Sequence, residues 1–161
     1  MIYQIEKITT LIGAHRFGNQ NASIGWLLTD SRSLSFPEAT LFFAIHTRKN
    51  DGHKYIADLY QQGVRNFVVE KLPTDYEANF PKSNFLRVPN TLKALQRLAE
   101  RHRDEFQIPV IGITGSNGKT TVKEWLFQIL SHDYTVTRSP RSYNSQIGVP
   151  LSVWRMDDNT D

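Results

Sequence analysis

The stretch PVIGITGSNGKTTVK, residues 109–123, decides the fold of this chain. A short apolar run at 110–113 meets a group of glycines, and apolar residues then recur at helical spacing from Val122 to Leu130. This order predicts a strand, a tight turn and a helix. A loop that binds phosphate groups requires the same setting.

The residue types in the turn fit phosphate chemistry. Gly115 and Gly118 leave backbone N–H groups open to a phosphate chain at a helix start, where the helix dipole favours negative charge. Lys119, the candidate catalytic residue, would place its ammonium on the β- and γ-phosphates, and the Thr120 hydroxyl is the expected Mg²⁺ ligand. The candidate nucleotide-binding residues are Gly115, Ser116, Asn117, Gly118, Lys119, Thr120 and Thr121.

The loop departs from the strict Walker pattern, because Ile113 stands where that pattern has its first glycine and Gly112 comes one residue too early. The alternative interpretation is a glycine-rich turn with a solvated lysine. The Gly-Lys-Thr sequence between a strand and a helix favours phosphate binding instead. It predicts ATP or GTP as a ligand without identifying the reaction.

Composition narrows the function classes. The 161 residues are 39% hydrophobic and 11% aromatic, which is enough for an ordinary core. The net charge of +3 is too small and too dispersed to predict nucleic-acid binding. The absence of cysteine excludes disulfides and thiol nucleophiles. The five histidines are dispersed, so no zinc site is expected, and we expect His102 to be a core residue.

No apolar run approaches the length of a membrane span, and the N-terminus lacks the features of a signal peptide. We therefore expect a soluble, cytoplasmic protein.

The chain before the loop alternates between helical and strand patterns, which predicts an α/β fold. The predicted helices cover 3–12, 53–62 and a long segment capped by Asn90 that reaches Phe106, and the predicted strands cover 26–29, 40–45, 67–69 and 85–88. Residues 13–25 and 72–82 are expected to be loops. The strand, helix and strand from Thr40 to Val69 predict a crossover between parallel strands.

A domain boundary is expected at Gln107–Pro109, which divides the chain into a small α/β domain, 1–106, and the start of a mainly parallel-sheet nucleotide domain, 107–161. A strand at 134–137 and a helix at 149–156 are expected in the second part. The 50 residues from Gly112 to Asp161 are too few to complete a doubly wound sheet around a nucleotide. The expectation is that the chain is the N-terminal piece of a longer enzyme.

Asp30-Ser31-Arg32 follows the first predicted strand, at the position where α/β proteins usually present ligand contacts. The alternative is a capped turn with a solvated arginine.

Three segments together carry a resemblance to a known family. They are Asp30-Ser31-Arg32 with the later LFFAI (41–45) and DGH (51–53), the loop TGSNGKTT (114–121), and YNSQIGVPL (143–151). In this order they resemble the Mur ligases, the ATP-dependent amide-forming enzymes of peptidoglycan synthesis. They are most similar to the members that join D-alanyl-D-alanine to UDP-N-acetylmuramoyl-tripeptide, including a form fused to an alanine racemase.

The resemblance implies a UDP-sugar-binding domain followed by the start of an ATP-binding domain, with ATP and Mg²⁺ as cofactors. It assigns substrate contacts to Asp30, Ser31, Arg32, Arg48, Lys49 and Asn50, and a nucleotide contact to Asn144. His46-Thr47 departs from the Lys-Gly found in many relatives. Two alternatives stay open at this point: another P-loop NTPase or kinase, and a nucleotide-binding module without catalysis.

Overall fold

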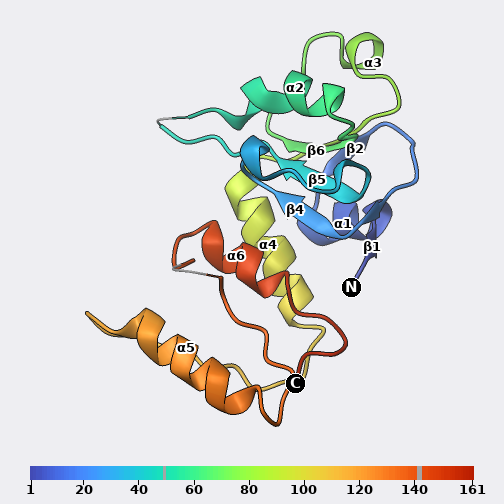
Figure 1. Cartoon of the computed structure of the whole chain (residues 1–161). Helices are drawn as coiled ribbons and strands as arrows, with labels where there is room; N and C mark the ends of the chain where they lie inside the picture. Colours follow the sequence, from blue (N-terminus) through green and yellow to red (C-terminus); the bar gives the residue numbers. More distant parts are fainter. Residues whose placement is uncertain (49, 141–142) are drawn as a thin grey trace. The chain divides into compact units, whose positions relative to one another are not determined.

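The computed structural model describes residues 1–48, 50–140 and 143–161 (Figure 1). It divides the chain into two compact units. The N-terminal unit consists of residues 2–98, and the C-terminal unit consists of residues 99–161 together with Met1. Helix α4 (Thr91–Arg103) runs through the point of division.

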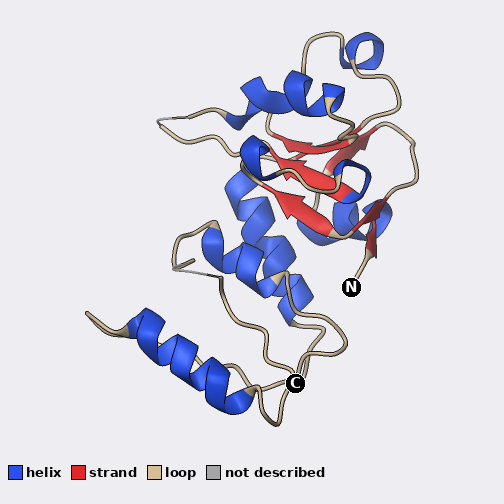
Figure 2. Ribbon diagram, viewed as in Figure 1, coloured by secondary structure: helices blue, strands red, loops and turns tan. Residues whose placement is uncertain are grey.

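The N-terminal unit is built on a five-stranded sheet with the order β2-β7-β6-β5-β4 (Figure 2). Four strands run parallel, and β2 pairs antiparallel with β7 at one edge. The strands are β2 (His15–Phe17), β4 (Trp26–Leu28), β5 (Thr40–Phe43), β6 (Asn66–Val69) and β7 (Asn84–Arg87). A separate antiparallel pair joins β1 (Tyr3–Gln4) to β3 (Ser23–Ile24).

Helices cover both faces of this sheet, which explains why β5 and β6 are buried at every position. In Figure 1, α2 (Ile56–Gln61) lies on one side, and α1 (Ile5–Ile12) and α4 lie on the other. Alternate residues of a strand point to opposite faces, so Phe42 and Phe67 pack in the cluster that contains Ile56 and Leu59 of α2. A short helix, α3 (Tyr76–Asn79), and three single-turn 3-10 helices complete the unit.

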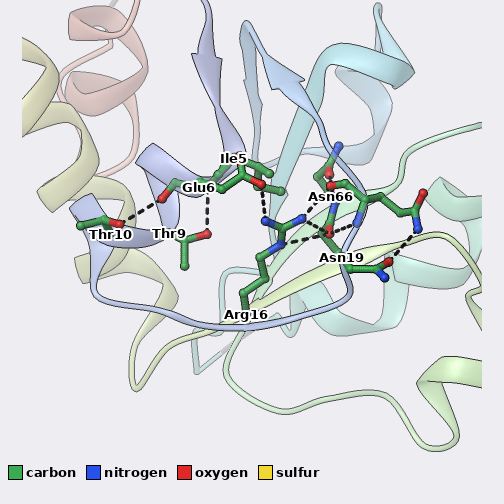
Figure 3. Close-up of polar contacts among 9 residues, drawn as sticks. Ile5, Glu6, Thr9, Thr10, Arg16, Asn19 and Asn66 are labelled. Carbon is green, nitrogen blue, oxygen red and sulfur yellow. Dashed lines mark hydrogen bonds and ion pairs between the residues drawn. The ribbon is translucent and has the colours of Figure 1, made fainter.

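A buried polar network lies at the amino ends of β6 and β7 (Figure 3). The Asn84 side chain is fully buried; its Nδ2 donates to Asn66 Oδ1 at 2.8 Å, and its Oδ1 accepts from Arg16 Nη2 at 3.0 Å. Arg16 also contacts Glu6 of α1 at 2.5 Å. Gly18 has a φ of +102°, and a Cβ there would lie 2.2 Å from the Ser83 carbonyl oxygen. The network therefore ties β2 and the turn after it to the sheet.

The C-terminal unit contains the last part of α4, then α5 (Lys119–Leu130) and α6 (Gly148–Val153). His102 is buried, and its Nε2 donates to the Met156 carbonyl oxygen at 3.0 Å. Its ring lies 4.8 Å from that of Trp154. The expectation of a core histidine is confirmed, and this side chain anchors the segment after α6.

Most of the predicted elements are confirmed within a few residues, including the parallel crossover from β5 to β6 and the Asn90 cap, where Asn90 Oδ1 accepts from Lys93 N at 2.8 Å. Five details are wrong. The helix expected from residue 3 begins at Ile5, because Tyr3–Gln4 forms β1. Residues 13–25 contain β2 and β3, residues 72–82 contain α3, and α4 ends at Arg103 before Phe106. The segment after Asp51 begins as a 3-10 helix, Gly52–Tyr55, before α2.

The strands expected at 110–113 and 134–137 are also wrong, because no described residue of the C-terminal unit lies in a strand. Val110 and Ile111 are 65% and 60% exposed. A parallel strand needs neighbouring strands to receive its N–H and C=O groups. The described part of this unit contains helices, turns and irregular segments, so the apolar run has no described strand to pair with.

Candidate functional site

The predicted phosphate loop leads directly into α5. Gly118 is the residue before the helix, and its φ of +77° lies in the left-handed region that glycine adopts without strain. A Cβ built on Gly118 would meet no atom within 4 Å, so the space beside the loop is open. No atom therefore crowds the Gly118 side of this turn, and binding of a phosphate to its backbone N–H groups stays a prediction.

Lys119 is the first residue of α5, and its side chain folds back over the loop. Its Nζ donates to the carbonyl oxygen of Gly115 at 2.5 Å and approaches that of Ser116 at 3.4 Å. The first turn of α5 carries no acidic residue. The helix dipole and this ammonium together give the loop a positive potential, which favours an anion there.

The start of α5 supplies one candidate oxygen ligand for Mg²⁺ and not a complete set. Thr120 is the second residue of the helix and carries the kind of oxygen that Mg²⁺ prefers. Within the part of the chain that the structure describes, no cluster of three or more histidine or acidic side chains could hold a metal. The remaining ligands would have to be phosphate oxygens, water or other protein groups.

Asn144 lies in the turn before α6 and is exposed. The turn is held by Ser145, whose Oγ accepts from Gly148 N at 2.9 Å. Gly148 passes close to Tyr143, whose Cα would lie 3.0 Å from a Cβ at residue 148. Among the described residues, no hydrogen bond joins Asn144 to the phosphate loop. The nucleotide role of Asn144 stays a prediction.

The candidate substrate residues lie in the N-terminal unit, after the carboxyl ends of its parallel strands. Asp30 follows β4 and begins the 3-10 helix Ser31–Ser33, with its carboxylate accepting from Arg32 N at 3.1 Å. The same carboxylate binds the Arg32 guanidinium at 2.6 and 2.9 Å. Hydrogen bonds from the Arg32 side chain and backbone hold the pKa of Asp30 below its usual value. An ionised, oriented Asp30–Arg32 pair results.

The β5 loop, defined as residues 46–48 and 50–51, follows the next strand. Thr47 N donates to the carbonyl oxygen of Asn50 at 2.8 Å, and Asn50 N donates to Thr47 Oγ1 at 3.0 Å. These bonds make a tight turn that carries Arg48 at its exposed side. Lys49, also a predicted substrate contact, lies outside the described residues.

A cavity of about 260 Å³ opens beside the β5 loop. Its lining is His46, Asp51, His53, Ile56, Glu70, Lys71, Leu72 and Pro73. Glu70 directly follows β6, so its place at a strand end was the available signal, although sequence reasoning did not select it. The carboxyl ends of β4, β5 and β6 thus present polar groups along one edge of the sheet.

A parallel sheet with polar residues at its strand ends, joined to a glycine loop that opens a helix, defines an α/β protein of the nucleotide-phosphate-binding class. Comparison with known families is consistent with both halves. The catalytic domain of the Mur ligase family matches residues 23–103, and the Mur ligase middle domain matches residues 113–161. The chain belongs to the Mur ligase family.

Curated relatives include the UDP-N-acetylmuramoyl-tripeptide–D-alanyl-D-alanine ligases of Bacillus subtilis and Treponema pallidum. The first is 34% identical over 83% of this chain and 28% of its own length. The second is 36% identical over 96% of this chain and 35% of its own length. The chain therefore spans about a third of the length of these relatives.

Solved structures give the same family. MurF from Acinetobacter baumannii has a TM-score of 0.88 and 25% identity, covering 99% of this chain and 34% of that one. MurF ligase from Thermotoga maritima, solved in complex with ADP, has a TM-score of 0.67 and 26% identity, covering 83% of this chain and 30% of that one. Among the described residues, no helix has both the length and the apolar character needed to cross a membrane.

Proposed function

We propose that this chain contributes the UDP-sugar-binding domain and the start of the ATP-binding domain of a ligase that joins D-alanyl-D-alanine to UDP-N-acetylmuramoyl-tripeptide. In this proposal the first domain covers residues 1–106 and the second begins at 107. The observation that carries it is the joint presence, in one chain, of the Lys119 phosphate loop and the Asp30–Arg32 pair at a strand end. The curated relatives with this printed activity support it.

In the proposed reaction, a terminal carboxylate oxygen of the tripeptide attacks the γ-phosphorus of ATP. The bond from that phosphorus to the bridging oxygen breaks, ADP leaves, and an acyl phosphate forms. The amine of D-alanyl-D-alanine then attacks the acyl carbon, inorganic phosphate leaves, and the amine loses a proton. ATP as the second substrate agrees with the ADP bound to the Thermotoga maritima relative. The proposal includes a cytoplasmic location, where ATP is supplied.

In this reaction the residues of this chain would neutralise the phosphate charge and position the substrates. The first barrier is the approach of a carboxylate to a tetra-anionic phosphate chain, so positive charge and backbone N–H donors must lie along the phosphates. Lys119 and the amides at Gly118–Thr121 supply both at the start of α5. Thr120 would be a ligand of Mg²⁺, which neutralises phosphate charge when bound. Arg32 would hold the diphosphate of the UDP-sugar, with Arg48, Lys49 and Asn50 beside it.

Calorimetry on the full-length protein tests the proposal. We expect UDP-N-acetylmuramoyl-tripeptide to bind without ATP, and phosphate release from ATP to require both the tripeptide substrate and D-alanyl-D-alanine. Binding of ATP without binding of the UDP-sugar would exclude the ligase and favour another P-loop NTPase or kinase. Binding of both with no phosphate release under any condition would favour a nucleotide-binding module without catalysis.

A further inference from the structure

His53 connects the base of the β5 loop to the end of β6. Its Nδ1 lies 2.6 Å from Asp51 Oδ1, and its Nε2 lies 3.0 Å from the backbone nitrogen of Glu70. The Asp51 carboxylate also accepts from His53 N at 3.0 Å. One imidazole ring therefore joins the last residue of the β5 loop to the residue after β6.

These contacts fix where the ring carries its proton. A backbone N–H can only donate, so Nε2 of His53 must accept from Glu70 N and cannot itself carry a hydrogen. The single proton of the neutral ring is then on Nδ1, where it is donated to the Asp51 carboxylate. His53 thus acts as a donor toward the loop and as an acceptor toward the sheet.

Other contacts at the base of the loop, including that of His46 Nδ1 with Asp51 Oδ2 at 3.6 Å, lie within residues 45–52, whereas His53 reaches the end of β6. Gly52 N donates to the carbonyl oxygen of Ile45 at 2.9 Å, and His46 pairs with Asp51 in an isolated antiparallel bridge. A Cβ on Gly52 would lie 2.8 Å from Ile45 N, so the two backbone segments pass too closely for any residue except glycine. The His53 side chain links this base to the end of β6, which is a different strand.

The charges around the ring favour the same arrangement. The cavity beside His53 is lined by His46, Asp51, Glu70 and Lys71. Glu70 Oε1 accepts from Thr91 N at 3.0 Å and from Thr91 Oγ1 at 3.1 Å, so this carboxylate is directed to the start of α4. Asp51 is the carboxylate that accepts the hydrogen bond from His53 Nδ1. Hydrogen bonds from the His53 backbone and side chain hold the pKa of Asp51 below its usual value.

We propose that His53 is a positioning residue for substrate binding, which holds the β5 loop in register with the end of β6 so that Arg48 and Asn50 meet the uridine diphosphate group. This inference rests on the proposed function for the identity of the ligand. The placement of the loop by His53 does not depend on it. His53 itself touches no substrate in this proposal and acts through Asp51.

Two variants separate the halves of the bridge in the full-length protein. His53→Asn keeps an amide donor near the Nδ1 position and loses the acceptor for Glu70 N. His53→Gln places an amide oxygen near the Nε2 position and loses the donor to Asp51. His53→Ala removes both, and His132→Asn, at an exposed turn, is the matched control.

Hydrogen exchange of the ligand-free proteins measures the positioning directly. We expect His53→Ala to accelerate exchange of the Thr47, Asn50, Gly52 and Glu70 amides at least tenfold, with smaller changes in His53→Asn and His53→Gln and none in His132→Asn. Nitrogen chemical shifts of the wild-type protein should show His53 protonated on Nδ1 and unprotonated on Nε2. Unchanged loop exchange in His53→Ala would overturn the inference. A proton on Nε2 in the wild type would also overturn it, and that measurement does not depend on how any variant folds.

Calorimetry with UDP and with ATP completes the test. We expect His53→Ala to weaken UDP binding at least tenfold and to leave ATP binding unchanged, with partial recovery in His53→Asn or His53→Gln. Equal losses for both nucleotides would show a general structural defect and overturn the positioning role. If the wild-type protein binds no UDP or UDP-sugar, the proposed function fails, and so does the role of the β5 loop in binding uridine diphosphate. The exchange data alone then decide whether His53 holds the loop.

Discussion

The carboxylate of Asp30 binds the guanidinium of Arg32 through both of its oxygens, with Nε 2.9 Å from Oδ1 and Nη2 2.6 Å from Oδ2. The Arg32 side chain is 87% exposed, so solvent screens the pair and its contribution to stability is small. What the pair does fix is direction, because a bidentate contact holds the planar guanidinium in one orientation at the end of β4. A surface arginine that is oriented without stabilising the fold is suited to binding an anion.

Replacing Arg32 should therefore weaken substrate binding and leave the fold intact. We expect Arg32→Ala to lower the affinity of the full-length protein for UDP-N-acetylmuramoyl-tripeptide about tenfold or more, since one charge-assisted contact contributes about 1.5–3 kcal/mol. The unfolding midpoint should stay within the change given by Arg101→Ala, a matched control whose partner Asp104 lies at 3.7 Å. Calorimetry and thermal unfolding measure the two effects. Equal UDP-sugar affinity for both variants would remove Arg32 from the site.

Lys119 should be required for the reaction with ATP. Its ammonium bonds to the Gly115 carbonyl oxygen, which keeps the charge over the loop. We expect Lys119→Ala to lower ATP-dependent phosphate release about a hundredfold or more, on the scale found when one preorganised group that stabilises transition-state charge is removed. Lys93→Ala, an exposed lysine on α4, is the control. Turnover within a few-fold of wild type for Lys119→Ala would contradict the role of the loop.

The buried network around Asn84 should contribute to the free energy of unfolding of the N-terminal unit. Asn84→Ala would leave Asn66 Oδ1, the Gln20 carbonyl oxygen and part of the Arg16 guanidinium without their partners. Buried polar groups that lose a partner cost about 1–3 kcal/mol each, so we expect a loss of about 2 kcal/mol or more in the free energy of unfolding.

Urea denaturation measures this loss, and Asn79→Ala is the control because Asn79 is exposed and its side chain donates to the Thr74 carbonyl oxygen. Similar midpoints for the two variants would mean that water replaces the Asn84 contacts at no cost.

The N-terminal unit was largely predictable because its signals are local. Phe42 and Phe67 lie in apolar runs that bury both faces of a strand, and the pattern in α1 repeats at helical spacing. Strand β2 was missed since His15–Phe17 is only partly buried and gains its strand structure from pairing with β7. Strands at 110–113 and 134–137 were predicted from the same kind of apolar run, and they fail where no neighbouring strand is described.

The candidate sites also differ in how far local sequence determines their geometry. Gly118, Lys119 and Thr120 are consecutive, so their geometry at the start of α5 follows from the local sequence. The contact between His53 Nε2 and Glu70 N joins residues 17 positions apart. It exists only because β5 and β6 are adjacent and end at the same edge. The DGH segment (51–53) draws attention to His53, but the partner of its Nε2, Glu70 N, is known only from the fold.

The stability of the N-terminal unit should fall in acid through Asp51. The pKa of this carboxyl is lowered in the fold, first by the His53 backbone N–H and then by the His53 side chain, relative to about 3.9 in an unfolded chain. A depressed folded pKa means that ionised Asp51 stabilises the fold above pH of about 4 and that this contribution is lost as pH falls through the folded pKa. Asp51→Asn keeps an oxygen for the His53 N–H and does not titrate.

Urea midpoints between pH of about 6 and 3 should therefore show wild-type protein losing stability more steeply than Asp51→Asn, with the wild type more stable at the upper end. The Asp51 side chain is 51% exposed, and screening at such a site limits the difference to under about 1 kcal/mol. Asp158→Asn, an exposed change in the C-terminal unit, should follow the wild-type curve. Parallel curves for wild type and Asp51→Asn would mean that the Asp51–His53 contact does not persist in solution, and the positioning of the β5 loop would then have to come from its backbone bonds alone.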